Sequence, residues 1–321
     1  QNLRKAAEIQ RQVRRFAQSI IKPGARLIDN AKDSKITTGI APEKGLESGI
    51  AFPTGCSLNH VAAHYTPNPG DNTVITYDDV CKIDFGTHIK GRMIDCAFTV
   101  AFNPTYDNLL MAVKDATNTG IREAGIDARL GEIEQGTVNN GVLLSLDKGK
   151  SVSRKNRSQF KWTFDRSLQD PAGKTVPCVK TNTNEKMEKD NSMPFKLSDL
   201  PEKVSLGKME IAPLYEGLLS TRQRQNPSSF KSLLQPHLRK GKNLLIQYST
   251  LAFAKRWLER LDFQSYILPL RDLVQNGIIN PYPPLADTQG CYVAQWEHTL
   301  ILDPPAKRYF QEAKISDKID S

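Results

Sequence analysis

Between residues 73 and 102 the sequence reads as β structure, with two alternating stretches at 81–89 and 93–102. Lys90-Gly91 separates the two stretches, and a glycine-containing turn of two residues joins antiparallel strands. We therefore expect a β-hairpin here. Because side chains alternate across a strand, this turn also fixes which residues share a face of the hairpin.

Two aspartates are placed on one face by that register. Asp84 lies opposite residue 97, so Asp84 and Asp95 become diagonal neighbours with Cβ atoms roughly 7–8 Å apart. Two unpaired carboxylates this close repel each other and are costly to bury. A pair of divalent cations about 3.5–4 Å apart resolves both problems and generates a hydroxide nucleophile. Two exposed acids on a hairpin would show the same spacing. The spacing alone therefore does not distinguish a metal site from two exposed acids.

The other periodic segments predict helices and one more strand around the hairpin. Helical spacing relates Leu3, Ala6, Ile9, Val13, Phe16 and Ile20. Residues 106–125 and 251–276 also read as helices, and the proline-rich stretch 280–285 stops the second of them. Residues 292–302 alternate and read as a returning strand.

The net charge of +9 is concentrated in two basic blocks. Residues 148–180 and 222–242 carry most of the excess Lys and Arg. A basic block can mark a nucleic-acid or ribosome contact, or it can be a solvated loop. Aromatic residues do not interleave with these blocks and no binding motif accompanies them, so we expect no specific nucleic-acid partner.

Three further features bear on the cellular location of the chain. It contains no run of about 18 apolar residues, so no membrane-spanning helix is expected. The five cysteines show no paired spacing, which favours the reducing cytosol over a disulfide framework. The first residues lack both an initiator Met and a signal-peptide core, so we expect a truncated N-terminus and a cytoplasmic protein.

Several motifs together resemble the type 2 methionine aminopeptidases. The segments that carry the resemblance are Ala62-Ala-His-Tyr-Thr-Pro-Asn68, Lys82-Ile-Asp-Phe-Gly-Thr-His88, Arg92-Met-Ile-Asp-Cys-Ala-Phe98, Ala172-Gly-Lys-Thr-Val-Pro177 and Ala294-Gln-Trp-Glu-His-Thr299. The resemblance is near-continuous over roughly 45–130 and returns from about 250 to 302. The resemblance implies an α+β fold, a single pita-bread domain over 1–321, with a helical insertion at about 251–285 that is typical of type 2 enzymes.

The same resemblance implies an activity and a set of site residues. The family removes the initiator Met of nascent proteins when the second residue is small, and it uses two divalent metal ions (Co, Mn, Zn or Fe). Association with ribosomes is a further expectation for its partners. Asp84, Asp95 and Glu297 match metal ligands, and His64 matches a catalytic histidine that faces the substrate. His298 follows Glu297 directly, so it should point to the opposite face of a regular strand.

Two further ligands of the family are missing where they should fall. Counted from the 172–177 motif, the ligand His falls at about Thr163; counted through Lys186-Met-Glu188, the ligand Glu falls at about Lys196. A lysine donates hydrogen bonds, cannot accept them, and carries a charge that opposes a cation. With three of five ligands, the chain is expected to bind two metal ions weakly or not at all.

The two ranges that should supply those ligands, 136–171 and 191–241, follow neither a helical nor a strand period. Back-translated and read from the second codon base, 161–170 permits N-G-H-S-I-G-P-Y-R-I, the His-ligand motif of the family. Read from the third base, 193–204 permits A-I-Q-T-F-G-S-T-G-K-G, the Glu-ligand strand with Gln in place of Glu. We therefore interpret both ranges as out-of-frame translations, at least in part.

Three hypotheses follow for this chain. It is an active dinuclear aminopeptidase, or a catalytically inactive paralogue that keeps the fold and binds partners, or the product of a damaged gene. The in-frame motifs favour the first hypothesis. The residues at 163 and 196 favour the other two.

Overall fold

The computed structural model describes residues 1–31, 46–133, 156–160, 186, 192–201, 218–221, 251–260, 266–276, 278–287, 289–303 and 306–309. Thr163 and most of 136–171 and 191–241 lie outside these ranges, so the out-of-frame interpretation stays a prediction. No helix within the described residues is long and apolar enough to cross a membrane.

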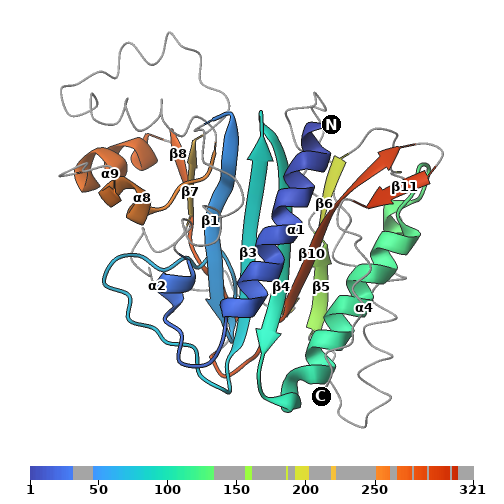
Figure 1. Ribbon diagram of the computed structural model, residues 1–321, viewed down its shortest axis with the longest axis horizontal. Helices are drawn as coiled ribbons and strands as arrows, with labels where there is room; N and C mark the ends of the chain where they lie inside the picture. Colours follow the sequence, from blue (N-terminus) through green and yellow to red (C-terminus); the bar gives the residue numbers. More distant parts are fainter. Residues whose placement is uncertain are drawn as a thin grey trace.

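A seven-stranded sheet forms the centre of the molecule (Figure 1), with strand order β1-β3-β4-β10-β6-β5 and β11 paired to β10. Its strands are β1 (Ser48–Leu58), β3 (Val80–Ile89), β4 (Arg92–Ala101), β5 (Asn156–Phe160), β6 (Ser192–Pro201), β10 (Gln295–Asp303) and β11 (Ala306–Tyr309). All pairings in this sheet are antiparallel. The sheet therefore places β10, from the end of the chain, directly beside the N-terminal hairpin.

The expected hairpin is β3–β4, and its register is the predicted one. Ile89 pairs with Arg92 around the Lys90-Gly91 turn, and Asp84 pairs with Ala97. Both turn residues have positive φ, 49° at Lys90 and 74° at Gly91, which is the backbone that matches the twist of two-residue hairpins. The predicted strand at 292–302 is confirmed as β10.

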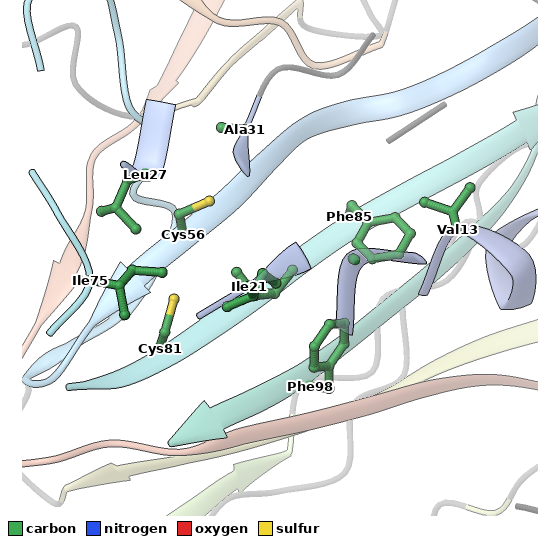
Figure 2. Close-up of a cluster of buried hydrophobic side chains, with 11 residues drawn as sticks. Val13, Ile21, Leu27, Ala31, Cys56, Ile75, Cys81, Phe85 and Phe98 are labelled. Atoms are coloured by element: carbon green, nitrogen blue, oxygen red, sulfur yellow. The ribbon is translucent and has the colours of Figure 1, made fainter. Parts of the chain in front are cut away.

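Helices α1 (Asn2–Ile20) and α4 (Asp107–Glu123) cover one face of the sheet (Figure 1). The predicted helices at 3–20 and 106–125 are therefore confirmed. Beneath α1, a buried cluster joins helix residues such as Val13 and Ala17 to Ile83, Phe85 and Phe98 of the hairpin (Figure 2). Burying a side chain as large as Phe85 contributes about 1.5–3 kcal/mol, so this cluster fixes the hairpin against the helix.

A second cluster fixes β10 in the same way. Val113, Ala116 and Ile121 of α4 pack with Leu300 of β10 and with Ala294, which directly precedes β10. Residues 294, 296 and 300 of this segment therefore turn toward the helices, and by strand alternation Glu297 turns toward the opposite face. Asp84, next to the buried Ile83 and Phe85, also lies on that opposite face.

The part of the chain from residue 251 to residue 286 forms a separate cluster beside β1 (Figure 1). It contains α8 (Lys255–Arg260), α9 (Ile267–Gln275), β8 (Ile279–Tyr282) and β9 (Leu285–Ala286). The predicted helical region 251–276 is thus two helices. The hydrophobic core between these helices and β8 consists of Phe253, Leu258, Tyr266, Leu270, Leu273, Ile278 and Ile279. β8 pairs with β7 (Leu218–Thr221) and β9 pairs with β2 (Val61–Ala63).

The described residues also form the short elements η1 (Pro104–Tyr106) and α2 (Leu27–Asn30). In η1 the Asn103 side chain accepts a hydrogen bond from the Thr105 backbone N–H at 3.0 Å. This is an N-cap interaction that satisfies a backbone donor at the helix start. It fixes the turn by which β4 leads into α4.

Candidate metal centre

Three strands each contribute one carboxylate to a single cluster. Asp84 of β3 pairs with Ala97 of β4, and Ala97 pairs with Glu297 of β10. Asp95 lies two residues from Ala97 and so shares its face. One oxygen of each carboxylate of Asp84, Asp95 and Glu297 lies within 4.8 Å of the others. The predicted diagonal placement of the two aspartates is confirmed, and the structure brings Glu297 to them.

Burial makes this cluster costly without a cation. Glu297 is 0% exposed and Asp84 is 9% exposed. Like charges that converge away from water destabilise the ionised forms, whereas a divalent cation among them reverses the sign of the interaction. Carboxylate oxygens are hard donors that suit divalent cations. The residues present therefore fit a divalent-metal site on the face opposite α1 and α4.

Gln295 joins two of the carboxylates from within the sheet. Its Nε2 donates to Oδ2 of Asp84 at 3.1 Å and to Oε2 of Glu297 at 3.3 Å. The side chain is fully buried. One amide group thus holds carboxylates of two strands at a fixed separation. Sequence reasoning missed Gln295, although its spacing two residues before Glu297 places it on the same face of the strand.

Threonine side chains join β4 to β10 on both sides of Glu297. The Thr99 hydroxyl donates to the Gln295 carbonyl at 2.8 Å and accepts from the Gln295 N–H at 2.7 Å. The Thr299 hydroxyl does the same for Asp95, at 2.7 Å to its carbonyl and 3.0 Å from its N–H. These bonds replace backbone ladder bonds next to the carboxylates and hold the two strands in register.

Behind the cluster, Arg14 of α1 packs between the rings of Phe98 and Trp296, with its guanidinium carbon 5.1 and 4.8 Å from the ring centroids. Its Nη1 donates to Cys96 Sγ at 3.2 Å, and the Cys96 thiol donates to the Glu297 carbonyl at 3.0 Å. Cation–π contacts of this kind are attractive, more so when desolvated. Helix α1 is thereby connected to the strands that carry two of the three carboxylates.

His64 is not a member of the carboxylate cluster, but its segment runs close to it. The residue after it, Tyr65, accepts a hydrogen bond at its carbonyl from the Cys56 N–H at 2.8 Å. Gly55, beside Cys56, pairs with Asp84. A Cβ on Gly55 would lie 3.3 Å from Asp84 Cβ and 3.7 Å from the Tyr65 carbonyl oxygen. The absence of a side chain at Gly55 lets the histidine segment approach the cluster.

The other candidate positions have three different outcomes. Trp296 Nε1 donates to His298 Nε2 at 2.8 Å, so His298 lies on the Trp296 face, opposite Glu297, as predicted. Thr163 lies outside the described residues. Lys196 belongs to β6, and its backbone pairs directly with Glu297. The interpretation of Lys196 as a lost ligand position stays a prediction. The pairing shows that residue 196 is a direct neighbour of Glu297 in the sheet.

Lys82 is a buried lysine two residues before Asp84. It is 1% exposed, and its Nζ donates to the carbonyls of Asn59 at 2.7 Å and Val80 at 3.2 Å. Burial lowers the pKa of Lys82 from 10.5 to about 7, because desolvation penalises the charged ammonium. Lys82 therefore connects the β1–β2 turn to the strand that carries Asp84.

This pKa predicts a pH dependence of stability. Between pH 7 and 10.5 the unfolded chain binds a proton at Lys82 and the folded protein does not, so the free energy of unfolding rises with pH across that window. We expect a contribution of at most about 1.4 kcal/mol per pH unit. Urea midpoints of the metal-free protein, measured in pH steps, should show this slope and Lys82→Met should lose it. Equal slopes in the two proteins would contradict the assignment.

Comparison with known proteins identifies the family. The Metallopeptidase family M24 model matches residues 1–139. The chain is 43% identical over 323 residues to methionine aminopeptidase 2 of Ajellomyces capsulatus, covering 95% of this chain and 66% of that protein. It is 43% identical over 314 residues to methionine aminopeptidase 2A of Arabidopsis thaliana, covering 95% and 68%. The chain thus spans about two thirds of the length of these relatives.

Solved structures show the same fold at low sequence identity. A thermophilic Arx1 superposes with a TM-score of 0.71 at 18% identity, over 98% of this chain and 91% of that one. Methionine aminopeptidase from Thermotoga maritima superposes with a TM-score of 0.54 at 14% identity, over 97% and 95%. The α+β pita-bread fold expected from the sequence is confirmed. With its matches along 95% of the sequence, the chain belongs to the type 2 methionine aminopeptidases, metallopeptidases of family M24.

Proposed function

We propose that this chain removes the N-terminal Met of nascent proteins whose second residue is small, with the carboxylate cluster as its metal centre. The convergence of Asp84, Asp95 and Glu297 from three strands carries the proposal. Each carboxylate is fixed by the sheet, so the donors are arranged before any ion binds. Preorganised donors of this kind are what a catalytic metal site requires.

Asp84, Asp95 and Glu297 would hold the divalent cations, and Gln295 would keep two of these carboxylates apart at a fixed distance. When bound, such ions lower the pKa of water toward neutrality and polarise the carbonyl of the peptide bond to be cleaved. The choice among Co, Mn, Zn and Fe is left to experiment, because carboxylate oxygens bind all four divalent ions.

His64 would bind the substrate beside this centre. Its imidazole is in edge-to-face contact with Tyr282 of β8, with ring centroids 5.8 Å apart. An imidazole can donate a hydrogen bond from one nitrogen to a peptide carbonyl. The aromatic contact restricts the orientation of the ring, so that donor would be presented to the substrate in one direction.

A non-catalytic binding role is the alternative, and Lys196 favours it. The family resemblance expects an acidic ligand at about this position, and the Lys196 backbone pairs with Glu297. A lysine brings no acceptor for a cation. On this alternative the chain is an inactive paralogue or the product of a damaged gene, and it retains at most the binding of nascent chains. Contact with ribosomes and a cytoplasmic location stay expectations from the resemblance.

Release of Met from a Met-Ala-Ser peptide separates the two functions. With added Co²⁺ or Mn²⁺ we expect turnover that a chelator abolishes, and no turnover of a matched peptide with Leu in place of Ala. The second peptide tests the preference for a small second residue at constant length. A folded protein that binds neither ion in calorimetry and releases no Met would exclude the enzyme and leave the binding role.

A further inference from the structure

The segment that carries His64 is bounded on one side by the C-terminal part of the chain. β2 pairs with β9 through Val61 with Ala286 and Ala63 with Leu285. The Asp287 N–H donates to the His60 carbonyl at 2.8 Å. These contacts end immediately before His64. They fix the approach of the chain to the histidine.

Arg256 of α8 fixes the chain immediately after the histidine. Its Nη1 donates to the Pro67 carbonyl at 3.1 Å and to the Thr66 hydroxyl, and its backbone N–H donates to Asn68 Oδ1 at 3.0 Å. The residue is 3% exposed. A buried guanidinium is tolerated only when hydrogen bonds replace its water. One residue of α8 therefore contacts three consecutive residues of the histidine segment.

The backbone of His64 requires such support. His64 has φ of 67°, in the left-handed region that costs a residue with a Cβ about 1–2 kcal/mol. Conformations of this kind persist only where the surroundings determine them. The Thr66 hydroxyl also donates to the Thr54 carbonyl at 2.7 Å, so Thr66 connects Arg256 to β1. Because β1 pairs with β3, the Thr66 hydroxyl connects α8 to the strand that carries Asp84.

We propose that Arg256 is a positioning residue that holds His64 in its substrate-binding conformation from the helical segment beside the sheet. The proposal rests on the proposed function for the role of His64. Arg256 contacts the histidine segment at the three residues 66–68. It acts through Thr66, Pro67 and Asn68, which determine where the chain leaves the histidine.

Kinetics test this with three substitutions. Arg256→Gln should lower kcat/KM for the Met-Ala-Ser peptide about 10–100-fold, since a shift near 1 Å of a substrate-positioning group has effects of this size. Arg256→Lys should recover part of the loss, because it restores a donor. Arg271→Gln, the same change at an exposed residue of α9, should leave kcat/KM unchanged. Co²⁺ affinity should stay the same in all three variants, because no ligand is altered.

A double substitution shows whether the effect passes through His64. In a His64→Ala background, Arg256→Gln should cause little further loss, because the group that it positions is already absent. Additive losses would overturn the proposal, since they would mean that Arg256 acts on the reaction by another route. Should Arg256→Gln fail to fold, Asn68→Ala removes only one of the three contacts and takes its place.

A readout without turnover separates this proposal from the proposed function. In protein labelled at its histidines, the His64 imidazole resonance, assigned by its loss in His64→Ala, should shift or broaden in Arg256→Gln. The resonances of His88 and His298 should not move. An unmoved His64 resonance overturns the positioning role even in an active enzyme. A moved resonance in a protein that releases no Met supports the positioning role and rejects the catalytic one.

Discussion

Asp84→Asn should abolish Met release and weaken divalent-metal binding more than about 100-fold. Loss of a partner outside the ligand shell of a metal already costs about 10–100-fold, and Asp84 would be a ligand itself. The asparagine keeps the size of the side chain but loses the charge and one acceptor oxygen. It would also disturb Gln295, whose Nε2 donates to Asp84 Oδ2. The peptide assay measures the loss of Met release, and calorimetry with Mn²⁺ and Co²⁺ measures the loss of metal affinity.

Stability in the absence of metal distinguishes the loss of a ligand from misfolding. Asp84 shares its cluster with Asp95 and Glu297, so removal of one charge relieves repulsion among buried and half-buried carboxylates. We expect the urea midpoint of metal-free Asp84→Asn to equal or exceed that of the unsubstituted protein. Added Mn²⁺ should then raise the midpoint of the unsubstituted protein only, because a ligand stabilises the state that binds it.

Asp78→Asn is the matched control. Asp78 carries the same side chain six residues earlier, outside the cluster, and accepts a hydrogen bond from Asn103 Nδ2 at 2.6 Å. Its substitution should change neither metal affinity nor turnover. Metal affinity of Asp84→Asn equal to that of the unsubstituted protein would show that the cluster is not the metal centre.

The hairpin was predictable because its information is local. A two-residue turn and strict alternation determine the β3–β4 register, and that register places Asp84 and Asp95 on one face. Glu297 was different, since it joins the aspartates from more than two hundred residues away. No periodicity links such distant positions, and only the resemblance to a family placed Glu297 with the aspartates.

Other contacts of the site left no local signal at all. Arg256 and Thr66 lie 190 residues apart, and a basic residue in an amphipathic helix reads as part of a solvated face. Lys82 likewise reads as an exposed residue of an alternating strand, yet carbonyls of Asn59 and Val80 surround its ammonium. Hydrogen bonds made by the buried side chains of Arg256 and Lys82 decide these cases, and they form only once the chain is folded.

Lys196→Glu should strengthen divalent-metal binding at least tenfold and bring the stoichiometry closer to two ions. The substitution removes a positive charge and adds a carboxylate at a backbone position that pairs with Glu297. Carboxylates are ligands for divalent cations whereas an ammonium group repels them. Calorimetric titration with Mn²⁺ measures both the affinity and the number of ions. Met release should rise in parallel, since a second ion supplies the other half of a two-metal centre.

Lys196→Met separates the two causes of this gain. It removes the charge without supplying a ligand, so we expect an affinity between those of the unsubstituted protein and Lys196→Glu. Stability tests the same substitution independently. Lys196→Glu adds a carboxylate at the position that pairs with Glu297, so it should lower the urea midpoint of the metal-free protein. Added Mn²⁺ should raise that midpoint above the value of the unsubstituted metal-free protein. A lower midpoint with no gain in affinity would show that position 196 is not a ligand position. In that case the ligand that limits metal affinity would be the histidine missing at Thr163, and Thr163→His would be the substitution that restores metal binding.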